Sequence, residues 1–261
     1  MKIHRINAIL LRYLYGTKRN VHRLGDLFYW PILELVVFGF ISVYFQKLSG
    51  ELNVMAFFLG ALIFWSILNR SSQDITVSFL EDIWSDNLLN IFASPLTVAE
   101  FILATIVLGL IRILAVLGVM TVLAFLIYHF SIFGFGVYLA LFLINLIIFG
   151  WAIGIYAMAM VLRFGRQAQF LAWSLAALIQ PASAVFYPAS VLPRFLQVMG
   201  KGLPSTYVFE GMRTVISTGS LDVKNLVIAF GLNIIYLVLA VLFFRWVYGI
   251  VRKRGLLAKL S

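Results

Sequence analysis

The chain has 261 residues, of which 63% are hydrophobic and only 11% are charged. Because soluble domains are about 25% charged, this composition excludes a soluble globular protein and predicts an integral membrane protein. The formal net charge of +10 does not indicate nucleic-acid binding, since the basic residues flank apolar segments and form no single basic face. The absence of Cys excludes disulfides and thiolate metal sites.

Residues 1–23 contain several Lys and Arg residues and no acid. Ile3, Leu10 and Leu14 fall on one helical face, which predicts an interfacial helix lying on the anionic cytoplasmic leaflet. A signal peptide is the alternative, but Arg12 interrupts the apolar run and no small-residue cleavage site follows.

Six apolar segments predict six membrane-spanning helices, because about 20 apolar residues cross the hydrocarbon core. Basic residues beside the short loops place both termini in the cytoplasm, with residues 249–261 as a tail, and we expect one domain over 1–261. The predicted spans are Leu24–Gln46, Val54–Leu68, Phe101–Tyr128, Gly134–Leu162, Gln169–Tyr187 and Val223–Tyr248.

The segment 79–92 combines apolar positions at helical spacing with the acids Glu81, Asp82 and Asp86 and with Trp84. An exposed acidic helix with an aromatic side chain is suited to docking into a groove on a soluble partner. A helix lying on the membrane surface is the alternative, although its acids would face anionic headgroups there.

Four of the six prolines lie between Pro181 and Arg213 and would break any single spanning helix. Apolar residues at helical spacing on either side of a Gly-Pro corner predict two short helices within 188–222. Helices of this length cannot cross a bilayer, so we expect an interfacial or re-entrant pair before the last span.

Two ionisable residues, Glu34 and Arg112, lie inside predicted spans. Each is about ten residues from the cytoplasmic boundary, or roughly 15 Å deep. Matched depth and opposite sign favour an ion pair, since a charge in hydrocarbon needs a partner or water. Such a pair would either line a translocation route or join two helices structurally.

Gly150 and Gly154 form a small-xxx-small pattern that favours close helix packing inside the chain over a dimer seam. The sequence contains no phosphate-binding loop of the form G-x-x-x-x-G-K-[ST], no zinc motif H-E-x-x-H and no nucleophile elbow G-x-S-x-G. It therefore predicts no catalytic residue, no metal site and no ATP hydrolysis by this chain itself.

The order of these parts resembles the permeases of type-2 ABC (ABC-2) exporters. The likeness covers essentially the whole chain, and it includes Ser94-Pro95-Leu96-Thr97 and Glu100 after the acidic segment. Its most specific portion lies between Pro181 and Arg213, with Phe186-Tyr187-Pro188, Leu192-Pro193, Leu203-Pro204 and Glu210-Gly211-x-Arg213.

The resemblance implies one half of an exporter in the cell (inner) membrane. In the family, two permease chains pair in the lipid bilayer, here expected as a homodimer, and each binds a separate ATPase subunit that carries ATP and Mg. Segment 79–92 would be the coupling helix, with Glu81, Asp82, Trp84 and Asp86 facing the ATPase. The external gate would be formed by Pro181, Tyr187, Pro188, Pro193, Pro204, Glu210 and Arg213.

The resemblance favours an amphiphilic, drug-like or lipid-like cargo, because Asp26-Leu27-Phe28-Tyr29-Trp30-Pro31 is closer to the general export branch. Lipid-linked polysaccharide or teichoic acid is the alternative cargo. A channel, an ion-coupled secondary transporter and a scaffold protein also stay open, although ion-coupled carriers usually show internal repeats and this sequence has none.

Overall fold

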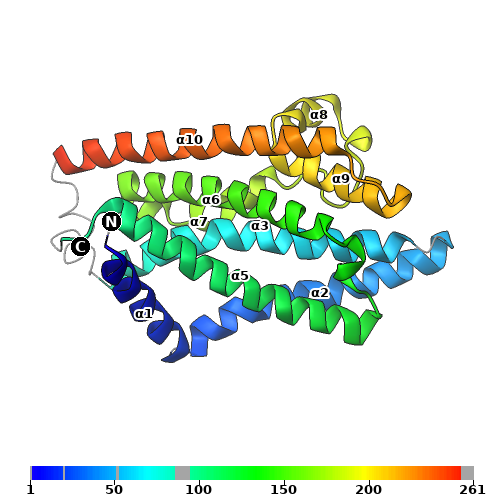
Figure 1. Cartoon of the computed structure of the whole chain (residues 1–261), viewed down its shortest axis with the longest axis horizontal. Coiled ribbons are helices and arrows are strands. Elements are labelled where there is room, and N and C mark those ends of the chain that lie inside the picture. Colours follow the sequence, from blue (N-terminus) through cyan, green and yellow to red (C-terminus); the bar gives the residue numbers. More distant parts are fainter. Residues whose placement is uncertain (1, 20, 51–52, 86–94, 254–261) are drawn as a thin grey trace.

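The computed structural model describes residues 2–19, 21–50, 53–85 and 95–253. Within these ranges the protein is all-helical, with no strand. Five long helices run side by side in a bundle (Figure 1), and each is long and apolar enough to cross a membrane. The chain is thus a multi-pass membrane protein. The five helices are α2 (Val21–Ser49), α3 (Asn53–Trp84), α5 (Val98–Tyr128), α6 (Tyr138–Phe164) and α10 (Val223–Lys253).

Shorter helices cover the two ends of the bundle (Figure 1). The amphipathic α1 (Ile3–Arg19) lies at the end where α10 finishes, hereafter the α1 end. At the opposite end, hereafter the α9 end, lie α8 (Arg194–Lys201) and α9 (Pro204–Thr218). The remaining elements are α7 (Leu171–Ile179) and the 3-10 helices η1 (Ile132–Phe135), η2 (Gly165–Ala168) and η3 (Ala189–Val191).

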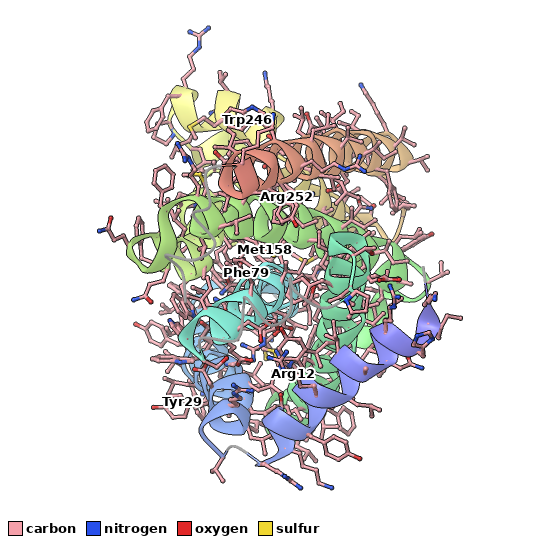
Figure 2. All side chains as sticks on the ribbon, turned by 90° about the vertical axis from the view of Figure 1, so that its left-hand side faces the viewer. Arg12, Tyr29, Phe79, Met158, Trp246 and Arg252 are labelled. Atoms are coloured by element: carbon pink, nitrogen blue, oxygen red, sulfur yellow. The ribbon has the colours of Figure 1, made fainter. Side chains whose placement is uncertain are left out.

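Apolar side chains of α3 and α6 form the centre of the bundle. Toward the α9 end the buried core includes Phe64, Phe142 and Phe209. Toward the α1 end it includes Phe79 and Met158, which lie in the middle of the molecule in Figure 2. The outer faces of α2, α5 and α10 carry exposed large apolar side chains, as expected of helices that contact lipid.

The second predicted span is longer than the sequence indicated. We expected it to end at Leu68, before the polar run from Asn69 to Asp74, but α3 continues as one helix to Trp84. The polar residues stay in the helix because their hydroxyl groups find partners there. Ser71 donates to the Ile67 carbonyl at 2.6 Å, and Thr76 donates to the Gly154 carbonyl of α6 at 3.0 Å.

The predicted fifth span, Gln169–Tyr187, is not a continuous helix. Only the nine residues of α7 are α-helical there, about 14 Å of helix against a hydrocarbon core of about 30 Å. The chain continues without regular structure from Gln180 and reaches η3 and α8 at the α9 end (Figure 1). Six spanning helices are therefore not confirmed, and five helices are long enough to span.

Gly150 and Gly154 pack inside the chain, as predicted, against α3. A β-carbon at Gly150 would lie 2.7 Å from the Leu68 carbonyl oxygen, and one at Gly154 would lie 2.6 Å from the Ser72 carbonyl oxygen. Real β-carbons do not approach backbone so closely, so glycine is required for α3 and α6 to meet at this distance.

We expect Gly150→Ala to destabilise the protein by about 1–3 kcal/mol, because overpacking would push α6 away from α3. The matched control is Gly118→Ala on α5, where a β-carbon meets nothing within 4 Å. Thermal unfolding in detergent measures both. Equal midpoints for the two variants would contradict this account of the α3–α6 contact.

Candidate functional site

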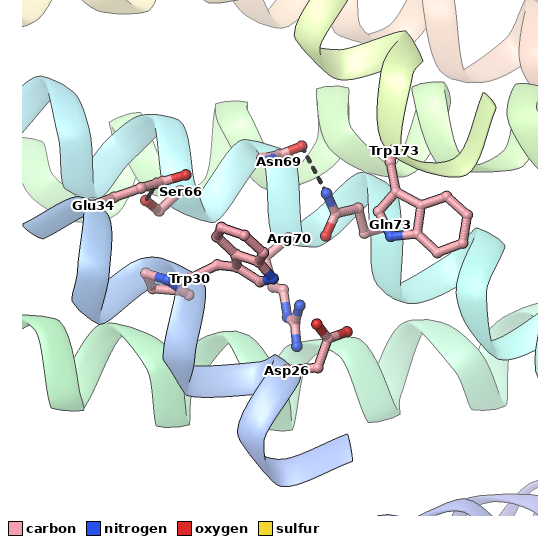
Figure 3. Close-up of a pocket in the computed structure, with 9 residues that line it drawn as sticks. Asp26, Trp30, Glu34, Ser66, Asn69, Arg70, Gln73 and Trp173 are labelled. Carbon is pink, nitrogen blue, oxygen red and sulfur yellow. Dashed lines mark hydrogen bonds between the residues drawn. The ribbon is translucent and has the colours of Figure 1, made fainter. Parts of the chain in front are cut away.

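A polar cavity of about 220 Å³ lies between α2, α3 and α7 (Figure 3). Two of its walls are the spanning helices α2 and α3, and polar and ionisable side chains inside spanning helices are costly and usually functional. Its lining residues are Asp26, Trp30, Pro31 and Glu34 from α2, Ser66, Asn69, Arg70 and Gln73 from α3, and Trp173 from α7.

The side chains of the cavity are held mainly by neighbours on α3. Ser66 donates to Glu34 at 3.5 Å, and Gln73 donates to the Asn69 side-chain oxygen at 3.2 Å. In Figure 3 the indole rings of Trp30 and Trp173 lie on either side of Gln73. The cavity thus combines two large aromatic surfaces with carboxylate and amide groups.

A second, smaller polar space of about 40 Å³ adjoins this cavity. It shares Asp26, Arg70, Gln73 and Trp173 with the cavity and extends to α1 and α5. Its further lining includes Thr17, Arg23, Asp74, Glu81 and Arg112. A continuous line of polar side chains therefore runs from the cavity toward the α1 end.

The hypothesised pair of Glu34 with Arg112 is wrong. Arg112 lies 3.3 Å from the Asp74 carboxylate and donates to the Thr17 hydroxyl at 2.8 Å, whereas Glu34 accepts from Ser66. The physical reason is the length of α3. Its continuation past Leu68 brings Asp74 into the bundle opposite Arg112, and this buried carboxylate satisfies the guanidinium.

The acids near the end of α3 do not form a free acidic face. Asp82 is fully buried and accepts hydrogen bonds from Arg12 and Tyr13 of α1. Glu81 pairs with Arg23 of α2 at 3.3 Å. Burial and the neighbouring Asp82 raise the pKa of Tyr13, so its hydroxyl stays protonated and remains a donor. The acids thus fasten α1 and α2 to α3, which corrects the prediction of an exposed helix at these positions.

Among the described members of the predicted coupling set, Trp84 is the exposed one. It stacks on Trp173 with ring centroids 6.4 Å apart, and its indole N–H donates to Gln169 at 3.3 Å. Asp86 and the rest of the segment to 92 lie outside the described residues. The end of α3 therefore contacts α7, which also lines the cavity.

The residues predicted for the external gate are brought together at the α9 end. Arg213 of α9 donates to the carbonyl groups of Ala184 and Val185 in the irregular segment after α7. Glu210 pairs with Arg213 at 3.0 Å and accepts from the Ala189 N–H at 2.7 Å. Burial lowers the pKa of the Arg213 guanidinium, an effect that Glu210 opposes. We call Glu210 and Arg213 the outer clamp.

The predicted prolines mark the breaks between the short elements. Pro188 precedes η3, Pro193 precedes α8, and Pro204 is the first residue of α9, where proline is favoured because no helix donor is lost. Tyr187 closes the preceding turn by donating to the Pro181 carbonyl at 3.0 Å. The prolines thus shape the turn that the outer clamp holds.

A family model described as ABC-2 type transporter matches residues 8–217. The chain belongs to the ABC-2 type transporter family. Members are membrane transport subunits, generally without an ATPase motif of their own, and normally pair with an ABC ATPase subunit. Comparison with curated proteins gives no match.

Sequence reasoning missed most of the cavity of this ABC-2 permease. Asn69 and Gln73, and likewise Arg70 and Asp74, are four residues apart and share one face of a helix. Treating this polar run as part of the second span would have revealed a polar stripe inside the membrane. Ser183 and Ser205, whose hydroxyl groups lie 2.8 Å apart, gave no comparable pattern.

Proposed function

We propose that this ABC-2 permease is the membrane subunit of an ATP-driven exporter for amphiphilic, drug-like or lipid-like molecules. The observation that carries the proposal is the polar, aromatic-lined cavity between α2, α3 and α7. A separate ATPase subunit, carrying ATP and Mg, would supply the energy. In this proposal the α1 end faces the cytoplasm of the cell membrane and two copies of the chain assemble as a homodimer.

The contact between Trp84 and Trp173 supports a route for energy coupling. The segment after α3 would contact the ATPase, and the end of α3 touches α7 through this stacked pair. Helix α7 lines the cavity and leads into the irregular segment held by the outer clamp. A shift of the end of α3 would thereby reach both the cavity and the α9 end.

The proposal is tested by expressing the permease with an ABC ATPase subunit encoded in a neighbouring reading frame and reconstituting the complex in liposomes. We expect the two subunits to co-purify and to move a fluorescent amphiphile only when ATP is hydrolysed. A complex that instead moves lipid-linked glycan would favour the alternative cargo. Failure to bind any ATPase, or transport driven by an ion gradient, would contradict the proposal.

We expect Trp84→Ala to slow transport about fivefold in the reconstituted complex. Loss of the aromatic stack removes about 1 kcal/mol of contact between α3 and α7, which weakens the mechanical link. Trp246→Ala on the exposed face of α10 is the matched control and should leave transport unchanged. Identical rates for both variants would exclude this coupling route.

A further inference from the structure

We infer that the cavity between α2, α3 and α7 binds an organic monocation, such as the substituted ammonium group of an amphiphile, with Glu34 as its counter-charge. This inference rests on the proposed function only in naming the class of cargo. The binding site itself is argued from the charges, the aromatic side chains and the size of the cavity.

The charges of the lining leave an excess of negative charge. The two adjoining polar spaces are lined by four carboxylates and three guanidinium groups. Arg23 pairs with Glu81, while Arg70 and Arg112 both face Asp74 at 3.6 Å and 3.3 Å. Within the described part of the chain, Asp26 and Glu34 have no ion-pair partner. One bound monocation would bring the lining to neutrality.

Arg70 does not turn the cavity into an anion site. Its Nε lies 3.6 Å from the Asp74 carboxylate, and in Figure 3 its guanidinium lies beside Asp26 and not beside Glu34. An anion entering the cavity would meet Asp26 and Glu34 as well as Arg70, and like charges in a partly desolvated site repel strongly. The two carboxylates therefore disfavour carboxylate or phosphate ligands in this cavity.

The aromatic lining is also suited to a cation. Trp30 and Trp173 both border the cavity, and the face of an indole attracts ammonium groups more strongly than the other aromatic rings do. Glu34 places a carboxylate on the same wall as Trp30, because both lie on α2 one turn apart. Together they offer a carboxylate and an aromatic surface to one ligand group.

The size of the cavity limits what enters it. Pockets for drug-sized ligands measure about 300–1,000 Å³, whereas this cavity is about 220 Å³. It would hold a cationic headgroup with one ring, but not a whole large amphiphile. Trp30 is 56% exposed on the outer face of α2, so the apolar remainder of a ligand can extend past it into lipid.

The test measures binding to the full-length permease in lipid nanodiscs by isothermal titration calorimetry. The probes are benzyltrimethylammonium and benzylsulfonate, which share a benzyl group and have opposite charges. We expect saturable binding of the cation and none of the anion. Glu34→Gln should weaken cation binding about tenfold or more, since the carboxylate charge is lost while side-chain shape is kept.

Asp222→Asn is the matched control for Glu34→Gln. Asp222 lies outside the cavity and accepts from the Asn225 N–H at 3.2 Å ahead of α10, a capping role that Asn also fills. It should leave cation affinity unchanged. Likewise, Trp30→Leu should weaken binding severalfold while Trp246→Leu should not, because only Trp30 lines the cavity.

Three results would overturn the inference: no binding of the cation, binding of the anion with equal or higher affinity, or equal cation affinity in Glu34→Gln and wild type. Elution of each variant as a single size-exclusion peak shows that it is folded. The measurement needs neither ATP nor transport. Transport confined to neutral amphiphiles would count against this inference alone, whereas cation binding without ATP-driven transport would count against the proposed function alone.

Discussion

Replacing Arg213 with Met is expected to abolish transport by the reconstituted complex while leaving the ATPase subunit bound. Arg213 reaches from α9 to two carbonyl groups of the irregular segment after α7 and pairs with Glu210. The pair is half-buried, and removing the guanidinium leaves the carbonyl groups of Ala184 and Val185 without their donor, at about 1–3 kcal/mol for each group left unsatisfied. The segment at the α9 end would then lose its fixed conformation.

The matched control is Arg194→Met on α8, which removes the same charge from an exposed side chain at the same end of the bundle. We expect normal transport from that variant. Arg213→Lys should recover little, since a single ammonium cannot replace the planar fork that contacts Glu210 and both carbonyls. Transport by Arg213→Met at more than half the wild-type rate would show that the outer clamp is not needed for export.

The arrangement of helices was largely predictable because most spans here are simple apolar segments. The spans expected at Leu24–Gln46, Phe101–Tyr128, Gly134–Leu162 and Val223–Tyr248 correspond to α2, α5, α6 and α10. Length and hydropathy alone identify such helices. The two short helices at the α9 end were also predictable, since their prolines and glycines mark where each helix must stop.

The predicted end of the second span and the predicted fifth span differ from the structure for a tertiary reason. The polar residues from Asn69 to Asp74 predict the end of a span at Leu68, because such residues are costly in lipid unless other helices supply their partners. Here Arg112 of α5 pairs with Asp74, the Gly154 carbonyl of α6 accepts from Thr76 two residues further on, and α3 continues. Conversely, Gln169–Tyr187 is apolar enough for a helix, but contacts with Ser205, Thr206 and Arg213 stabilise a non-helical end.

The candidate site, like the span boundaries, depends on contacts between helices that the sequence pattern does not reveal. The residue types that matter in a membrane, Glu34 and Arg112, were identified from the sequence, but their partners were not. The partner of each residue depends on which helix packs against it in the bundle. The spacing of apolar residues along the sequence does not contain that information. Asp82 illustrates the point, because its pattern favoured an exposed face whereas its partners Arg12 and Tyr13 lie on α1, about 70 residues earlier.

Asp74→Asn is expected to destabilise the permease by about 3–5 kcal/mol, or roughly 10 °C in its unfolding midpoint in detergent. The Asp74 carboxylate is the shared counter-ion of Arg70 and Arg112. Without its charge, two guanidinium groups would lie close together inside the bundle with no acid between them. Thermal unfolding followed by size-exclusion chromatography measures the loss.

Glu34→Gln distinguishes this network from the pairing that the sequence suggested. If Arg112 depended on Glu34, that variant would be as unstable as Asp74→Asn. The structure instead predicts a midpoint close to wild type, because among the described residues the hydrogen-bond partner of Glu34 is the uncharged Ser66. Adding Arg112→Met to Asp74→Asn should restore part of the lost stability, since one of the two unpaired charges is removed. A double variant less stable than Asp74→Asn alone would mean that Arg112 is held chiefly by Thr17.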